Sequence, residues 1–445
     1  MAPTQNLKGP KGQLYAEQKQ FPDETQFQRS NTSSAYYNSP YYLVHKNQVQ
    51  PIPARRNGVP PNIQLADYVP AEVGSGIQAA KSISFHSVGD TGAAKVSRTQ
   101  TAATALEHQA AVADAMVADV QKGGPGGPAF FFHLGDIIYN FGEGQYYYDQ
   151  FYEPYREYDR PIFAIPGNHD GMVFGQGSTA PQGPTLDAFL TNFCAASPGP
   201  SPDGGGLVRS VMTQPGVYFT LDAPYVSIIG LYSNVLDGPG VISSQGGHFP
   251  LVNDQLDFLA SELQRLKADR QAGKRAIILA IHHLPLSTDT KHGGSTGPMA
   301  DIDAVCKKAG LWPDAVLSGH AHLYQRFTRV HPNGSQAPYI VCGSGGFSAT
   351  PPSVKPPAAP FKLGDFTLEV NPIVEFGYLT VTTDAKTLTI TFFTAMPKVA
   401  VAQADTVTVD LKKGAIVGSG GSPVMGGSGG KSPSGTKKPR KKGKG

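Results

Sequence analysis

The chain of 445 residues is 40% apolar and 16% charged, with 52 glycines and 38 prolines. This composition excludes a wholly disordered protein, and no run of about 18 apolar residues is present that would cross a bilayer as a helix. Residues 431–445 hold seven of the 37 Lys and Arg and no acidic residue, so residues 1–430 carry 30 positive and 34 negative groups. The body is therefore slightly acidic and offers no general surface for polyanions.

Cysteine usage and the N-terminus give expectations about the compartment. Cys194, Cys306 and Cys342 lie far apart without a CxxC spacing, which predicts ordinary thiols rather than disulfides or a zinc–cysteine site. The N-terminal residues lack the apolar core of a secretory signal. We therefore expect a cytoplasmic protein.

The expected elements begin after a polar N-terminal extension. Residues 1–80 are rich in Pro, Asn and Gln, and we expect them to wrap the body without a core of their own. Buried strands are predicted at 82–88, 129–134, 162–165, 225–231, 276–281, 315–318 and 339–344. Helices are predicted from a cap at Ser97 to about residue 117 and over 253–270, where leucines repeat at helical spacing. This order of strands and helices predicts an α/β fold.

The last third of the chain is predicted to be extended. Residues 376–384 and 387–395 are typical of a hairpin, and 405–411 of a further edge strand. The segments 173–215 and 350–360 are predicted as long loops, a length that is more often functional than idle. The Gly-, Ser- and Lys-rich residues 412–445 predict a disordered basic tail.

Five of the predicted strands run directly into polar clusters. In chain order these clusters are DTG at 90–92, GDIIY at 135–139, GNHD at 167–170, HHLP at 282–285 and GHAH at 319–322. A single such cluster is ordinarily a turn or a helix cap, but five ionisable clusters after five apolar strands are costly for a core. Open α/β sheets bind ligands beyond the carboxyl ends of their strands. Oxygen and imidazole donors without thiolate, in this number, favour two divalent or ferric ions.

These motifs, in this order, resemble the calcineurin-like metallophosphoesterase superfamily, and the Tyr of GDIIY resembles its purple acid phosphatase branch. The resemblance covers residues 82–395 and implies a four-layer α/β/β/α sandwich, with residues 81–411 as the catalytic domain. It also implies a centre of Fe(III) plus a divalent iron, zinc or manganese ion. In such a centre Asp90, Tyr139 and His322 would bind the ferric ion, Asn168, His283 and His320 the divalent ion, and Asp136 would bridge the two.

Several histidines near the motifs need an assignment. The family places its ligand two residues before the proline of HHLP, which selects His283 and leaves His282 as a neighbour. His292 lies nine residues after His283, where plant-type relatives place a substrate-binding histidine, and a solvated loop histidine is the alternative. We expect His86 and His133, on the first two strands, to be buried or to support the ligands.

The chemistry follows from the repulsion between a phosphate ester and an anionic nucleophile. Two cations that bind the ester oxygens and lower the pKa of a water remove this obstacle, which predicts attack on a phosphate monoester by a metal-bound hydroxide. His169, beside the ligand Asn168, is predicted to protonate the leaving alcohol, with Asp170 orienting it. A phosphodiesterase or nucleotide hydrolase of the same superfamily is the alternative enzyme.

A different class of function also stays open. The basic tail at 431–445 is typical of segments that bind nucleic acid or an anionic surface, although a solvated chain end is the simpler interpretation. Tyr139 as an aromatic core residue is likewise the alternative to Tyr139 as a ligand. Many relatives carry an N-terminal β-domain and many are exported, whereas from residues 1–80 we expect neither feature here, and Gln325 stands where an acidic residue is common.

Overall fold

The computed structural model describes two short strands near the N-terminus and most of the chain from residue 52 to residue 421. The short strands are Leu7–Lys8 (β1) and Leu14–Tyr15 (β2), and the described ranges are 52–92, 102–139, 142–171, 186–207, 209–233, 239–244, 251–289, 292–352 and 357–421. Ser97 and residues 422–445 of the predicted basic tail lie outside these residues. None of the helices described here is long and apolar enough to cross a membrane.

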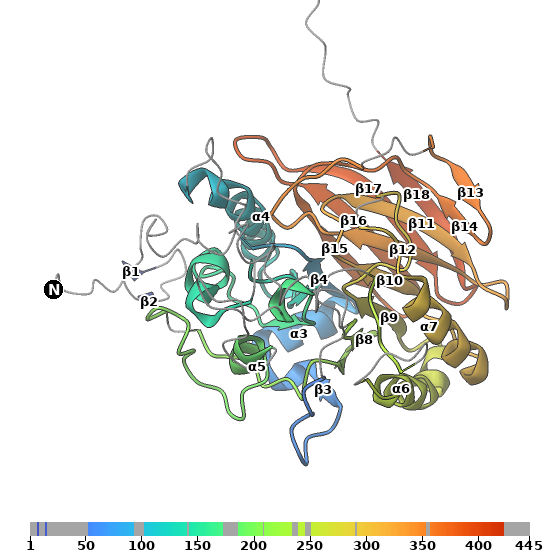
Figure 1. Cartoon of the computed structure of the whole chain (residues 1–445), viewed down its shortest axis with the longest axis horizontal. Coiled ribbons are helices and arrows are strands. Elements are labelled where there is room, and N and C mark those ends of the chain that lie inside the picture. The colour runs from blue at the N-terminus through green and yellow to red at the C-terminus, as the bar shows by residue number, and fades with distance from the viewer. Residues whose placement is uncertain are drawn as a thin grey trace, which may run out of the picture.

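Two sheets form the centre of the molecule (Figure 1). The nine-stranded sheet has the order β13 (Phe361–Leu363), β14 (Phe366–Leu368), β11 (Tyr324–Val330), β12 (Gln336–Cys342), β10 (Ala315–Ser318), β9 (Ala276–Ile281), β8 (Val226–Leu231), β7 (Phe219–Ala223), β3 (Asn62–Gln64). The seven-stranded sheet has the order β18 (Ala415–Gly421), β17 (Ala402–Asp410), β16 (Thr387–Thr394), β15 (Gly377–Thr383), β4 (Ile83–Val88), β5 (Phe131–His133), β6 (Ile162–Ala164). The predicted α/β class is confirmed.

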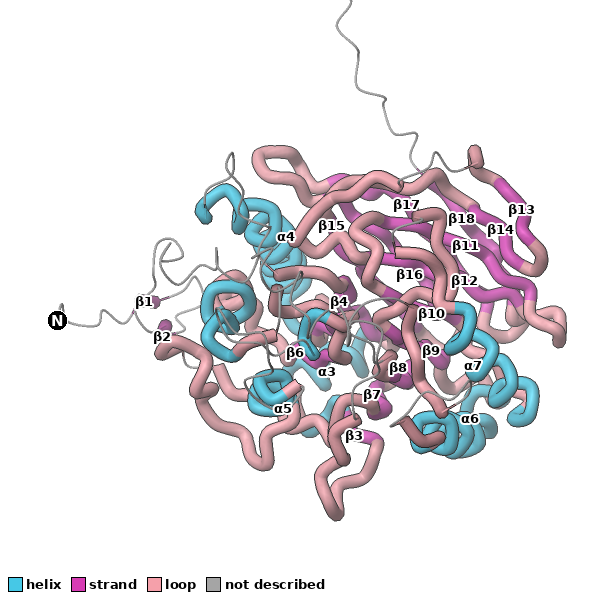
Figure 2. The backbone as a smooth tube through the Cα atoms, viewed as in Figure 1, coloured by secondary structure: helices cyan, strands magenta, loops and turns pink. Residues whose placement is uncertain are grey.

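Helices cover the two sheets from opposite sides (Figures 1 and 2). The α-helices among the described residues are α3 (Ala71–Ala80), α4 (Ala102–Gly123), α5 (Asp187–Phe193), α6 (Asp254–Gln271) and α7 (Thr296–Ala309). Helix α4 contacts β15 of the seven-stranded sheet, whereas α6 contacts β8 and β9 of the nine-stranded sheet and packs beside α7. Two sheets between helices agree with the predicted sandwich.

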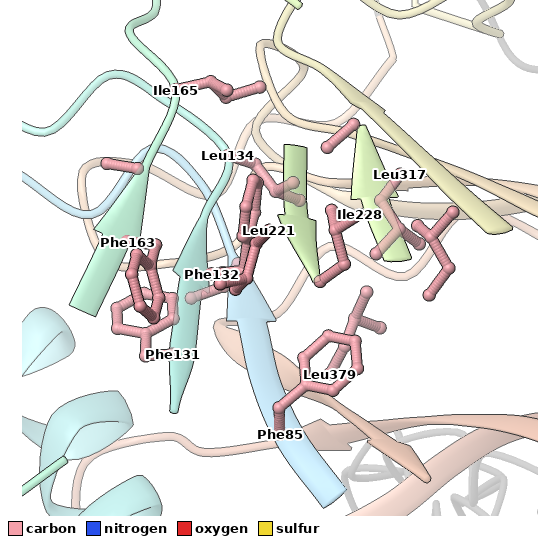
Figure 3. Close-up of a cluster of buried hydrophobic side chains, with 14 of the residues drawn as sticks. Phe85, Phe131, Phe132, Leu134, Phe163, Ile165, Leu221, Ile228, Leu317 and Leu379 are labelled. Carbon is pink, nitrogen blue, oxygen red and sulfur yellow. The ribbon is translucent and has the colours of Figure 1, made fainter. Parts of the chain in front are cut away.

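The sequence pattern of each strand matches the surface that it buries. In β16 the threonines alternate with buried Leu388, Ile390 and Phe392, because this strand lies in an antiparallel sheet with one covered face. Every residue of β9 is buried, because this strand lies in the parallel part of its sheet with both faces covered. Figure 3 shows Phe85 and Phe132 of one sheet pointing toward Leu221 and Ile228 of the other.

The sheets approach each other closely at β8. A Cβ atom at Gly230 would lie 2.7 Å from Ile165, so only glycine fits at this contact. Farther along the interface, Tyr324 of β11 stacks on Phe392 of β16 with ring centroids 4.2 Å apart. Beside this stack the Arg326 guanidinium pairs with the Asp405 carboxylate across the two sheets.

The body extends past the predicted domain ends on both sides. Ile63 of β3 and Val73 and Ile77 of α3 are buried in the main core, although they lie before residue 81. Strand β18 pairs with β17 beyond residue 411, because backbone hydrogen bonds allow a Gly- and Ser-rich segment to join a sheet edge. The predicted long loop 173–215 contains α5 among its described residues.

Candidate metal centre

The polar clusters meet at the carboxyl ends of parallel strands from both sheets. Strands β4, β5 and β6 run parallel in register, with Val88 opposite His133 and His133 opposite Ala164, so the loops that follow them leave at one level. Strands β9 and β10 run parallel in the other sheet, with Ala280 opposite Leu317. The structure thus brings together all five predicted clusters, three from one sheet and two from the other.

The first group of predicted ligands surrounds the phenol of Tyr139. Its hydroxyl donates to Asp90 Oδ1 at 3.0 Å and to Asp136 Oδ2 at 2.9 Å, and lies 3.3 Å from His322 Nε2. His322 Nε2 also lies 3.4 Å from Asp90 Oδ1. Two carboxylates, a phenol and an imidazole therefore point at one small volume, and the assignment of this group to a ferric ion stays a prediction.

The second group surrounds the amide of Asn168. Its Oδ1 lies 3.1 Å from His320 Nδ1 and 3.2 Å from His282 Nε2. The ring of His283 lies 4.3 Å, centroid to centroid, from the ring of His320. Asp136 stands between the two groups, because its Oδ2 also lies 3.4 Å from His282 Nε2. This position agrees with a bridging carboxylate.

Both neighbouring histidines offer a nitrogen to an ion. His283 Nδ1 lies 2.8 Å from Ser233 Oγ, and its Nε2 is buried without a hydrogen-bond partner. His282 Nδ1 donates to the Leu134 carbonyl at 2.8 Å, so Nε2 is the nitrogen that would face an ion once the ring has lost its second proton. Ligand atoms of Asp136, His282 and His320 all lie within 4.8 Å of one another. The sequence leaves His282 outside the ligand set, whereas the geometry adds it to the candidates.

The backbone is strained at three of the predicted ligands. Asp90, Asp136 and His320 have φ angles of 58°, 54° and 69°, in the left-handed region that non-glycine residues rarely adopt. Such conformations persist only where the surroundings enforce them, and they gather at functional sites. A Cβ atom at Gly319 would lie 2.6 Å from Asp90 Oδ2, so glycine at this position leaves the space that the buried carboxylate occupies.

Charge and burial set the protonation of these groups. Although burial alone would raise it, the charge of His282 holds the pKa of Asp136 well below its usual value. Burial, and then the charges of Asp136 and Asp90, raise the pKa of Tyr139 well above its usual value. Without an ion the Tyr139 proton is thus shared between two carboxylates. A cation would take the place of that proton, so the donor set fits a metal.

The imidazoles of the candidate metal centre differ in their protonation state. Burial, followed by the charge of His282, lowers the pKa of His283 well below its usual value, and burial followed by His283 does the same for His320. Burial also opposes the charge on His282, but the Asp136 carboxylate raises its pKa to about 9. Neutral imidazole is the form that binds metal. His283 and His320 are therefore ready as ligands, whereas His282 must first lose a proton.

His169 and Asp170 both lie at the candidate metal centre. The carboxylate of Asp170 binds backbone amides there. It accepts hydrogen bonds from the amides of Ile137 and Ile138 through Oδ1 and from Gly167 through Oδ2, at 2.8–3.1 Å. It therefore fastens the loop after β5 to the loop after β6. The half-buried His169 ring lies 4.4 Å from the Tyr139 ring, at the edge of the first ligand group. The predicted role of His169 in proton transfer, and that of Asp170 in orienting it, stay predictions.

His292 reaches the site from its loop. Its ring centroid lies 5.0 Å from that of His320 and 5.1 Å from that of His322. Its Nδ1 lies 2.7 Å from the buried carboxylate of Asp289, which also accepts from its backbone amide at 3.3 Å. His292 is therefore held against the predicted ligands, and its role in binding substrate stays a prediction.

The remaining residues that the sequence analysis named hold loops of the site in place or lie buried. His133 Nδ1 accepts from the Gly135 amide at 3.1 Å and Nε2 lies 2.8 Å from Thr91 Oγ1, so it joins the first two loops. Burial, then the charge of His282, lowers its pKa to about 3. His86 is buried 3.0 Å from the Tyr158 hydroxyl. Gln325 accepts from Thr288, in the loop that leads to His292. The three cysteines are free and buried.

Sequence reasoning missed the residues that support the ligands. Ser233, Gln150, Asp289 and Phe347 contact predicted ligands or His292 from segments without a motif or regular spacing. The one available signal is the glycine-rich stretch GSGG at 343–346, which directly precedes Phe347.

Three solved structures are similar to this chain at low sequence identity. GAP50, the anchor in the inner membrane complex of Plasmodium, is 14% identical with a TM-score of 0.48, and the match covers 72% of this chain and 88% of that one. A structure of PhoD is 13% identical with a TM-score of 0.46, covering 78% and 73%. A dimetal phosphatase from Danio rerio is 12% identical with a TM-score of 0.40, covering 72% and 98%.

Sequence comparison decides the family. No curated protein matches the chain. The model of the calcineurin-like phosphoesterase family matches residues 85–324, just over half of the chain and the whole span from the first motif to the last. The chain therefore belongs to the calcineurin-like phosphoesterase family.

Proposed function

We propose that the chain hydrolyses phosphate monoesters at a centre of one ferric and one divalent ion, as acid phosphatases of the purple type do. Membership of the family implies metal-dependent hydrolysis of phosphoesters. The observation that carries the finer proposal is the position of Tyr139. Its hydroxyl lies within 3.3 Å of donor atoms from Asp90, Asp136 and His322, where a phenolate would complete a ferric set.

The proposed ligands follow the two groups in the structure. Asp90, Tyr139 and His322 would hold the ferric ion, Asn168, His283 and His320 the divalent ion (iron, zinc or manganese), and Asp136 both, with His282 as a further candidate. Bound there, the ions would supply Lewis acidity to the phosphate oxygens and lower the pKa of the attacking water.

The remaining residues would bind the substrate and move protons. His169, His292 and His320 are partly exposed, whereas the other predicted ligands are buried, so these three mark the open side of the site. In its protonated form His292 would donate from Nε2 to a phosphate oxygen while its Nδ1–H donates to Asp289. His169 would protonate the leaving alkoxide. Asp170 would position both flanking loops through its three backbone hydrogen bonds.

The test is a visible absorption spectrum with metal analysis on the same samples of wild type and Tyr139→Phe, purified aerobically after growth with iron. We expect a broad visible band in the wild type that is absent from the variant while iron stays bound. Iron bound without a band in the wild type refutes the purple assignment.

Relative rates on a phosphate monoester and a phosphodiester test the substrate class. The proposal predicts faster hydrolysis of the monoester. The opposite preference would favour the phosphodiesterase or nucleotide hydrolase of the same superfamily.

A further inference from the structure

The backbone of Tyr139 is held by a single side chain. The amide of Gln150 accepts from the Tyr139 N–H through Oε1 at 2.8 Å and donates to the Tyr139 carbonyl through Nε2 at 2.7 Å. A side-chain amide is the group that donates and accepts at this spacing, so Gln150 takes the place of a neighbouring strand. Gln150 lies in a π-helix, Tyr148–Tyr152, a rare element that is frequent at functional sites.

The ring of Tyr139 is held by a second residue from another part of the chain. Phe347 stacks on it with ring centroids 3.5 Å apart and planes 2° from parallel. Phe347 is fixed in turn, because its N–H donates to the Asp90 carbonyl at 3.1 Å. On the Tyr139 side, a Cβ atom at Gly92 would lie 2.6 Å from Tyr139 Cδ2, so the ring has no room to move toward that strand end.

Gln150 and the loop that carries Phe347 both contact Gln109 of helix α4. The side chain of this buried glutamine donates to the Gln150 carbonyl. Gly346, directly before Phe347, has φ 144°, and a Cβ atom there would lie 2.6 Å from Gln109 Cα. The loop that carries Phe347 therefore packs against the same helix residue that donates a hydrogen bond to Gln150. Backbone and ring of Tyr139 are held against one common support.

We propose that Gln150 and Phe347 are positioning residues that hold the Tyr139 phenol where it binds the ion shared with Asp90. This inference rests on the proposed function, in which Tyr139 is a ligand. The reason is geometric. The phenol must reach a point between two carboxylates, and the double hydrogen bond fixes where the side chain starts while the stacked ring fixes its direction.

The chain offers a matched control for the hydrogen bonds. Gln214 is buried and makes the same pair of bonds to Ala164, accepting from its N–H at 2.8 Å and donating to its carbonyl at 2.9 Å. Gln214→Met thus removes an equivalent double hydrogen bond from a residue that is not a predicted ligand. It reports the general cost in stability of losing such a pair.

The experiment compares iron-loaded wild type, Gln150→Met, Phe347→Leu, Phe347→Tyr and Gln214→Met. Each protein is measured for iron affinity by competition with a chelator, for the position and intensity of the visible band, and for thermal stability. We expect Gln150→Met and Phe347→Leu to bind iron about 10-fold to 100-fold more weakly and to shift or weaken the band. Phe347→Tyr keeps the stacked ring and should restore both properties, and Gln214→Met should lower only the thermal midpoint.

Three results would overturn the inference. The first is wild-type affinity and spectrum in both Gln150→Met and Phe347→Leu, and the second is an equal spectral change in Gln214→Met. The third is iron in the wild type without a band, because Tyr139 is then not a ligand. The first two results leave the band of the wild type intact and refute the positioning role alone, whereas the third refutes the ligand assignment on which that role rests. A band that depends on Gln150 and Phe347, without hydrolysis of a phosphate monoester, supports the positioning role and refutes the substrate assignment.

Discussion

Replacing Asp405 by asparagine removes one charge from a buried ion pair between the two sheets. Asp405 of β17 accepts from Arg326 Nε at 2.6 Å and Nη2 at 3.1 Å, and from the Tyr324 hydroxyl at 2.7 Å. All three side chains are buried, and Asp405 is 0% exposed. Because the variant leaves a buried guanidinium without its counter-charge, we expect the free energy of unfolding to fall by about 3–5 kcal/mol.

Urea unfolding followed by circular dichroism measures this loss. Asp303→Asn is the control, because Asp303 pairs with Arg329 but is 28% exposed, and Arg329 keeps Asp365 as a second partner. This variant should lose about 1 kcal/mol or less. The double variant Arg326→Met with Asp405→Leu removes both charges and should recover most of the stability. A loss below about 1 kcal/mol in Asp405→Asn, or a double variant no more stable than the single one, would contradict the reasoning.

Three further predictions concern the ligands and a buried histidine. Asp136→Asn should lose both ions, measured by metal analysis, because this carboxylate stands between the two groups; loss of one ion alone would refute bridging. His283→Gln should lower the divalent metal content and His282→Gln should do so too, and an unchanged content in either variant removes that residue from the ligand set. Burial, then Arg329, lowers the pKa of His331 from 6.5 to about 4. Between pH 4 and pH 6.5 His331 therefore binds a proton in the unfolded chain but not in the folded chain. The free energy of unfolding is therefore highest above pH 6.5 and falls by about 3 kcal/mol toward pH 4. His331→Gln should flatten this slope in urea unfolding, and an unchanged slope would contradict it.

The parallel strands were predictable because both of their faces are buried. Runs such as AIILAI and AFFFHL show this directly as continuous apolar sequence, and β9 and β5 lie within them. The same strands end in the motif residues, so the sequence also predicts which ligands share an edge. The convergence of Asp90, Asp136 and His320 needed only the order of strands and the rule that ligands bind at their carboxyl ends.

Strand β11 was not predictable from apolar periodicity. Its residues Gln325, Arg326 and Arg329 are buried, and hydrogen bonds and ion pairs compensate for the burial of their polar groups. In the sequence, such polar residues instead suggest a solvent-exposed segment. The residues that hold the ligands in position were not predictable for a related reason. Gln150 acts through hydrogen bonds to backbone and Phe347 through the face of its ring, and neither requires a spacing that a sequence pattern reveals.

The origin of the predicted ligands in two different sheets has a thermodynamic consequence. Strands β4 and β5 deliver Asp90 and Asp136, whereas β9 and β10 deliver the histidines, so bound ions would cross-link two layers that meet otherwise through side-chain packing and a few polar contacts. Binding that requires both layers in place stabilises the folded chain by RT ln(1 + [L]/Kd), about 2.7 kcal/mol at 100 times Kd. The free metal concentration thereby becomes a determinant of how firmly the two halves of the sandwich hold together.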